Sequence, residues 1–135
     1  IADYGGVVNT MPKVSAFALL FVMANCGLPG TAGFVGEWMV ILAAVKANFW
    51  IGLAAASALI FGAAYSLWMF KRVYLGAPGN HHVKELLDIN GREFLIMALL
   101  AVAVLYMGIH PKPFTDVMDG SVAELLRHVA ISKLN

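Results

Sequence analysis

The longest apolar stretch of the chain is interrupted near its middle, and this interruption limits the possible folds more than any other feature. The run Val14–Val45 contains a single charged side chain, Glu37. One straight helix over this run would be about 48 Å long at 1.5 Å per residue, whereas the hydrocarbon core of a bilayer is about 30 Å thick. The middle of the run holds Gly27, Pro29 and Gly30, and proline both removes a backbone donor and clashes with the preceding helical turn. The sequence therefore predicts two half-helices joined by a break.

The composition places the chain among membrane proteins. Of its 135 residues, 61% are hydrophobic and 13% are charged, whereas soluble globular chains are about half apolar and about a quarter charged. The net charge of +1 indicates no basic surface, so we expect no nucleic-acid partner. The single cysteine, Cys26, cannot form an internal disulfide and lacks the spacing of a metal site. Because the chain begins without Met and without signal-peptide features, we expect it to be the C-terminal piece of a longer protein.

Two further apolar blocks have the length of membrane spans. Residues 49–70 are uncharged and carry aromatic side chains at both ends, which suits the membrane interfaces. Residues 94–109 form a shorter block, which Pro111 and Pro113 are expected to end. Together with the broken span, these blocks predict an all-α membrane protein in which residues 1–110 form three transmembrane helices, the first of them discontinuous.

Small residues in the block 49–70 indicate a helix that another helix approaches closely. They lie four positions apart at Gly52 and Ala56, and again at Gly62 and Ser66. Because small side chains let two helix backbones come near each other in a membrane, we expect a helix–helix contact along this face.

The interrupted run allows two arrangements, namely one span broken in its middle or a hairpin of two short re-entrant halves. The single span puts Lys13 on the same side of the membrane as the basic segment 71–93, as the distribution of Lys and Arg in short loops favours. We therefore expect one broken span, with the loop 71–93 cytoplasmic and the tail from His110 extracytoplasmic.

A helix break at membrane depth indicates a functional site and not a surface that faces lipid. Free backbone groups cannot face lipid, so the break must lie in protein or line a wet cavity. Discontinuous helices of this kind occur at transport sites, where half-helix ends offer backbone groups and dipoles to an ion. We expect Gly27, Pro29, Gly30 and Thr31 to form the break. A simple kink used for packing is the alternative.

Glu37 is the candidate functional residue because an acid inside a spanning segment is costly and should face a bundle interior. Burial favours the neutral carboxyl group, whereas the positive end of the second half-helix, beginning near Thr31, favours the carboxylate. This balance suits a group that binds and releases a proton, and the residue would lie toward the outer side of the membrane. The alternative is a static buried ion pair.

The tail, residues 111–135, is expected to contain an amphipathic helix over 121–134. Ser121 with Glu124 three positions later is the pattern of a capping box. An apolar stripe at helical spacing follows, formed by Val122, Leu125, Leu126 and Val129. This helix would lie on the membrane surface or dock a partner protein, and the shortage of Lys and Arg favours docking.

Other chemistry has weak support in the sequence. His81 and His82 stand in a polar segment with no third ligand at a suitable spacing, which favours a solvated loop over a metal site. The sequence contains no P-loop, dinucleotide fingerprint or nucleophile–base arrangement. We therefore expect no metal and no cofactor in this chain.

Several motifs in order resemble a known family. GLPGTAGFVGE, AAYSLWMFKRVYLG, DINGREFL and MGIHPKPF are similar to the C-terminal part of the antiporter-like membrane subunits of bacterial respiratory complex I, the proton-pumping NADH:quinone oxidoreductase. Multisubunit cation/proton antiporters contain related subunits. Glu37 is the sharper mark, because two sister subunits of complex I typically carry lysine at this position, whereas the subunit that this chain resembles carries glutamate.

The resemblance implies a fragment of a fourteen-helix antiporter-like fold. Residues 14–45, 49–70 and 94–109 would be its last three helices, and the tail helix would link neighbouring antiporter-like subunits on the periplasmic side. Glu37 would match the ionisable residue of the broken helix and act as a proton relay toward that side. The other ionisable groups of the family would lie upstream of Ile1.

The function that the resemblance implies is proton translocation in the bacterial inner membrane. The chain would be part of an enzyme subunit without a redox site of its own, since NADH, FMN, iron–sulfur clusters and quinone would bind elsewhere in the parent complex. Its partners would be other membrane subunits of complex I and the lipid bilayer. The alternatives are a subunit of a cation/proton antiporter and a purely structural assembly element.

Overall fold

The structure, a computed structural model, describes residues 4–132, and these residues form helices joined by short connections. Along the chain they are the 3-10 helix η1 (Val7–Asn9), α1 (Pro12–Asn25), α2 (Ala32–Ala47), α3 (Phe49–Tyr74), the short α4 (His81–Lys84), α5 (Gly91–Ile109) and α6 (Lys112–Ser132). The all-helical class predicted from the sequence is confirmed for the described residues. Helices α3 and α5 have the length and apolar composition needed to cross a membrane.

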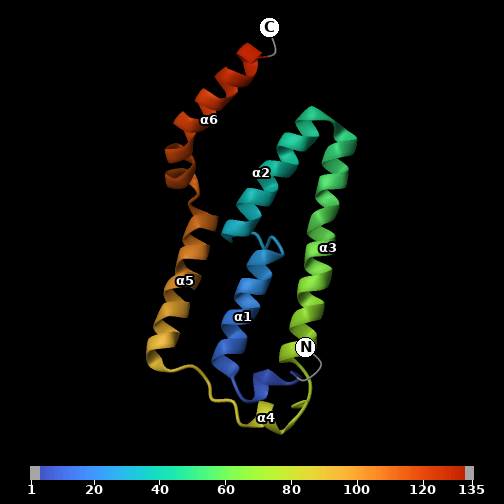
Figure 1. The fold of residues 1–135 in the computed structure, drawn as a ribbon, viewed down its shortest axis with the longest axis vertical. Helices are drawn as coiled ribbons and strands as arrows, with labels where there is room; N and C mark the ends of the chain where they lie inside the picture. Colours follow the sequence, from blue (N-terminus) through green and yellow to red (C-terminus); the bar gives the residue numbers. More distant parts are fainter. Residues whose placement is uncertain (1–3, 133–135) are drawn as a thin grey trace.

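The apolar run is broken into α1 and α2, as predicted, and the two half-helices follow one another in the same direction (Figure 1). Helix α3 runs back beside both of them. At one end Gly52 of α3 lies against Val45 of α2, and at the level of the break the Asn25 side chain donates to Ser66 Oγ at 3.3 Å. The arrangement is therefore a broken helix rather than a re-entrant hairpin. The helix contact expected along the small residues of α3 is also confirmed.

Helix α5 packs on the broken helix from a side that α3 leaves open (Figure 1). Phe94 in its first turn meets Phe17 of α1 edge-on, with ring centroids 5.3 Å apart. Near its other end Gly108 lies directly against the backbone of Gly30 and Thr31. The break thus lies between α3 and α5, with Thr31 buried and Leu28 and Pro29 exposed.

Helices α3 and α5 begin where polar side chains satisfy their first amides. Asn48 accepts hydrogen bonds from Trp50 N at 2.8 Å and Ile51 N at 3.4 Å and so starts α3. Asn90 and Glu93 form a capping box at the start of α5. Helix α3 continues through Lys71 and Arg72 to Tyr74. The segment 71–93, expected to be a loop, therefore contains the last turn of α3 and the helix α4.

The start of the predicted helix 121–134 is wrong, because α6 begins at Lys112 and reaches Ser132. Pro111 and Pro113 end α5 as expected, but they do not prevent a new helix. A proline in the first turn is tolerated because the amides there have no intrahelical partner. Phe114 N and Thr115 N donate to Pro111 O at 3.0 and 3.1 Å. The predicted end at residue 134 lies outside the described residues.

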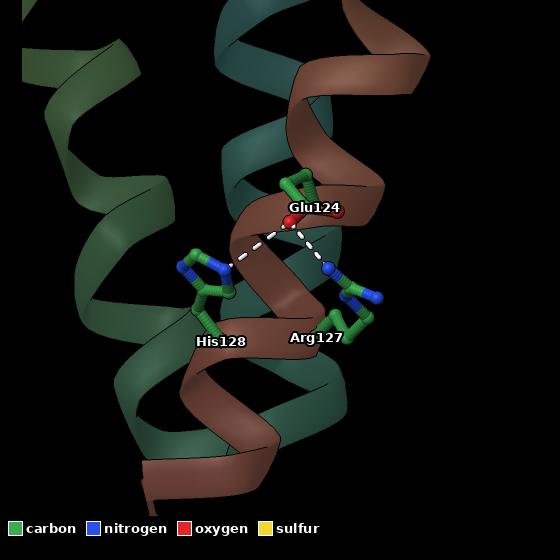
Figure 2. Close-up of polar contacts among 3 residues, drawn as sticks. All are labelled: Glu124, Arg127 and His128. Carbon is green, nitrogen blue, oxygen red and sulfur yellow. Dashed lines mark hydrogen bonds and ion pairs between the residues drawn. The ribbon is translucent and has the colours of Figure 1, made fainter.

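The capping box expected at Ser121 does not form, because that residue is inside α6. Glu124 turns instead toward residues further along the same helix. Its Oε1 accepts a hydrogen bond from Arg127 at 2.8 Å and contacts His128 Nε2 at 3.1 Å (Figure 2). All side chains from 116 to 130 are exposed, and α6 extends beyond the other helices (Figure 1).

Candidate functional site

Helix α1 ends in a hydrogen-bonding pattern that requires glycine. Gly27 N donates to Ala24 O at 3.3 Å and Leu28 N donates to Met23 O at 3.1 Å, which is the pair of bonds that defines a Schellman motif. Gly27 has a φ of 74°, a left-handed conformation that side chains with a Cβ rarely adopt. Gly27 therefore stops α1 and turns the chain out of the helical path.

The chain then passes through Pro29 and Gly30, which has a φ of 91°, to Thr31. Thr31 is 1% exposed and takes the N-cap position of α2, but its side chain caps no amide there. Its hydroxyl donates instead to Leu28 O at 2.7 Å, and its amide donates to the same oxygen at 3.1 Å. Thr31 thus closes the break internally, while α2 begins without the usual side-chain cap on its partly positive end.

Glu37 lies in the second turn of α2, and its carboxyl group reaches back to the break. Side chains on a helix lean toward its N-terminus, and here this direction brings Oε2 against Gly27. A Cβ on Gly27 would collide with this oxygen and would come within 3.0 Å of Leu59 Cδ2 of α3. Gly27 therefore has two roles, since it ends α1 and leaves space for the carboxyl group.

The Oε2 atom of Glu37 is buried and has no hydrogen-bond partner among the described residues. A buried unpaired oxygen costs about 1–3 kcal/mol, and more if it is charged. Glu37 also lines a cavity of about 180 Å³ whose other lining residues are apolar, namely Val40, Ile41, Ala55, Ala58 and Leu59. A water takes about 30 Å³ in the liquid but needs two or more polar partners when buried. The carboxyl group therefore needs a proton, a chain of waters or a cation from outside the described residues.

The predicted site residues come together around this carboxyl group to different extents. Gly27 touches it, whereas Gly30 and Thr31 face Gly108 on α5. Pro29 lies between Gly27 and Gly30 in the turn. On the side of α3, Cys26 Sγ lies 3.9 Å from Gly62 O, which holds the end of α1 to that helix.

Two contributors were missed by reasoning from the sequence. Leu59 closes the carboxyl group from α3, and nothing distinguishes it from other apolar residues of that helix. Gly108 carries a usable signal, because a glycine inside an apolar helix often marks a close approach of two backbones.

The histidine pair 81–82 lies apart from the break, in the exposed helix α4 rather than in a loop. His81 Nδ1 contacts Glu85 Oε1 at 3.0 Å. Among residues 4–132, no three His, Cys, Asp or Glu side chains lie close enough to share a metal ion.

The fold and the site define a class, namely helical membrane proteins in which a discontinuous helix carries one acid beside its break. Residues 1–62 match the family described as NADH:quinone oxidoreductase/Mrp antiporter, TM. The chain belongs to this family, and its closely similar relatives within it are subunits of respiratory complex I.

Curated relatives align with almost the whole chain. It is 42% identical over 128 residues to NADH-quinone oxidoreductase subunit M of Rhodobacter capsulatus, covering 95% of this chain and 25% of that protein. It is also 42% identical over 125 residues to NADH-ubiquinone oxidoreductase chain 4 of Arabidopsis thaliana, covering 93% and 25%. The chain therefore spans about a quarter of the length of these relatives.

A solved structure has the same fold over most of the chain. The structure of respiratory complex I from Thermus thermophilus with bound NADH matches with a TM-score of 0.72 and 37% sequence identity. The match covers 82% of this chain and 23% of the chain in that complex. The resemblance stated from the sequence motifs is thus confirmed.

Proposed function

We propose that this chain is part of a proton-translocating membrane subunit of an NADH:quinone oxidoreductase, with Glu37 as a proton relay at the helix break. The observation that carries the proposal is the buried, unpartnered Oε2 atom beside Gly27. A buried oxygen without a partner is costly, so this carboxyl group needs a proton or a polar neighbour from outside the described residues. Such a need is expected of a group that gains and loses a proton.

The remainder of the proton route would come from parts of the full protein that this chain does not contain. The cavity beside Glu37 offers apolar walls from α2 and α3, so polar neighbours and waters must approach from another side. Moving one charge against 100 mV costs about 2.3 kcal/mol. The proton affinity of Glu37 must therefore change by at least a comparable amount during a cycle that quinone reduction drives elsewhere.

In this proposal α1 with α2, α3 and α5 are three membrane spans of a fourteen-helix subunit. The segment 71–93 faces the cytoplasm and α6 lies on the periplasmic side of a bacterial inner membrane. The apolar stripe of α6 docks on a neighbouring antiporter-like subunit. The support for this docking is an exposed apolar row on α6, formed by Val122, Leu125, Leu126 and Val129.

The redox groups of the parent complex would bind other subunits. An iron–sulfur cluster is held by several thiolates, whereas this chain has one cysteine, which sits at the break against Gly62 O. These residues do not fit a cluster, and no step of the proposed proton transfer passes through NADH, FMN or quinone bound to this chain.

The test is Glu37→Gln in the full-length protein, assembled in its membrane complex. We expect the complex to form in normal amounts on a native gel. Proton uptake into vesicles per NADH oxidised should fall at least severalfold, because the amide cannot carry the proton. Glu85→Gln, at an exposed acid of the same chain, is the matched control and should pump normally. Full pumping by Glu37→Gln would remove the relay and leave a structural role for these helices.

A second candidate is a cation/proton antiporter subunit, because the matched family includes Mrp antiporters. It predicts that the full-length protein purifies without flavin and iron–sulfur proteins. Co-purification of such proteins would decide for the oxidoreductase.

A further inference from the structure

The first turn of α1 is capped by a residue that is distant in the sequence. Pro12 has no amide hydrogen, and Ser15 N donates to Met11 O at 3.0 Å. The two remaining amides of the turn belong to Lys13 and Val14. They donate to the carboxylate of Asp88, at 3.0 Å to Oδ2 and 3.3 Å to Oδ1. Asp88 therefore satisfies both amides that no other group takes.

Asp88 is well suited to this role because it is ionised at neutral pH. Desolvation raises the pKa of its carboxyl group. The amides of Lys13, Ile89 and Val14 and the charge of Lys13 lower it, so that the pKa lies below its ordinary value. A carboxylate at a helix N-terminus also interacts favourably with the helix dipole.

The far side of the break, where α2 begins, is held by Gly108. A Cβ on this residue would collide with Gly30 O and with the backbone of Thr31. Backbone atoms cannot move aside as the end of a flexible side chain can. A larger residue at position 108 would therefore push the break away from α5.

Asp88 and Gly108 stand at opposite ends of α5, Asp88 just before the helix and Gly108 within it. Asp88 stands two residues before Asn90, the N-cap of α5, and Gly108 lies in the last turn of that helix. The helix between Gly91 and Gly108 is about 26 Å long at 1.5 Å per residue. One end of this length fixes the start of α1, and the other end fixes the break.

The geometry points to α5 as the positioning element of the site: through Asp88 and Gly108 it holds the start of α1 and the start of α2, and so sets where the break meets Glu37. Asp88 and Gly108 touch no proton carrier themselves and act through the position of Gly27 and the carboxyl group above it. Their effect on pumping rests on the proposed relay, whereas their effect on the position of the break does not.

Two variant pairs test this role in the full-length protein assembled in its complex. Gly108→Ala is compared with Gly91→Ala on the same helix, where a Cβ meets open space. Asp88→Ala is compared with Glu85→Ala, an exposed acid three residues earlier. We expect severalfold lower proton pumping per NADH for Gly108→Ala and about a twofold loss for Asp88→Ala, with normal pumping in both controls. Asp88→Asn keeps one acceptor oxygen and should restore part of the activity.

The position of the break is measured separately through Cys26, which lies at the end of α1. The labelling rate of this thiol by N-ethylmaleimide in the intact complex is followed by mass spectrometry of its peptide. We expect a severalfold faster rate in Gly108→Ala and a smaller increase in Asp88→Ala. Labelling at the wild-type rate in both variants overturns the positioning role, whatever the pumping assay gives. If Glu37→Gln pumps normally while labelling responds, the relay is wrong and the positioning role stands. If Gly108→Ala does not assemble, the Asp88 series decides.

Discussion

The helix break and the tail helix both combine apolar and polar residues. The break pairs polar groups within the chain, whereas the tail helix leaves its side chains exposed. At the break, Thr31 is 1% exposed and its hydroxyl and amide both bond to Leu28 O. Gly108 of α5 lets its backbone come directly against Gly30 and Thr31. In α6 every side chain from 116 to 130 is exposed, including the apolar stripe. The backbone of the break is thus held by contacts within this chain, whereas α6 presents an apolar stripe that no described residue covers.

The difference separates two kinds of dependence on the rest of the protein. At the break one oxygen, Glu37 Oε2, lacks a partner among the described residues, while the backbone there is held by α3 and α5. In the tail helix a whole apolar face is exposed, which the proposed function assigns to a partner. Substitutions at the break should therefore change transport in an assembled complex, and substitutions on the stripe of α6 should change assembly itself.

The largest effect on transport without loss of assembly is expected for Gly27→Ala. The substitution places a Cβ in a left-handed conformation, which costs about 1–2 kcal/mol, and the Cβ collides with Glu37 Oε2. We expect proton pumping to fall as far as in Glu37→Gln, with a normal amount of complex on a native gel. Gly36→Ala is the matched control, because a Cβ there meets open space. Normal pumping by Gly27→Ala would show that the carboxyl group does not need its place above the break.

Much of this contrast follows from residue types, and part of it does not. Gly27, Pro29 and Gly30 predicted the break because each opposes a continuous helix for a local, physical reason. Glu37 was identifiable because an acid in an apolar run is costly. Where its carboxyl group points depends on Gly27 and Leu59, which lie on other segments, and the apolar walls of the adjacent cavity depend on how α3 packs.

Local sequence patterns could predict neither the positioning contacts of α5 nor the residue at which α6 begins. Asp88 caps a helix 75 positions away along the sequence, and no pattern in DIN indicates which amides it will meet. Ser121 and Glu124 matched a capping box, but the helix had already begun at Lys112. Two prolines suggested an end, although a proline is also compatible with a first turn.

An intermediate effect, on assembly instead of transport, is expected for Leu125→Asp. Leu125 is 63% exposed in this chain, and burying a leucine against a partner is worth about 1.5–3 kcal/mol. A carboxylate at its place opposes docking, so the amount of complete complex on a native gel should fall severalfold. Ala123→Asp introduces the same charge off the stripe and should assemble normally. Equal amounts of complex from the two variants would show that the stripe does not dock.

The smallest effect is expected for Glu124→Gln, which removes the acid that Arg127 and His128 share on α6 (Figure 2). The three side chains are 54% to 68% exposed, and exposed pairs of this kind contribute about 0.3–0.5 kcal/mol. The expected result is an unchanged amount of complex on a native gel and normal pumping, because this face stays in water when the stripe docks. Glu124→Gln thereby tests which face of α6 is covered. A loss of complex as large as that of Leu125→Asp would mean that the polar face is buried against the partner as well, since only desolvated pairs become costly to break. In that case partners would cover both faces of α6. Thr31 at the break and the side chains of α6 would then both be buried, and they would differ only in whether this chain or a partner buries them.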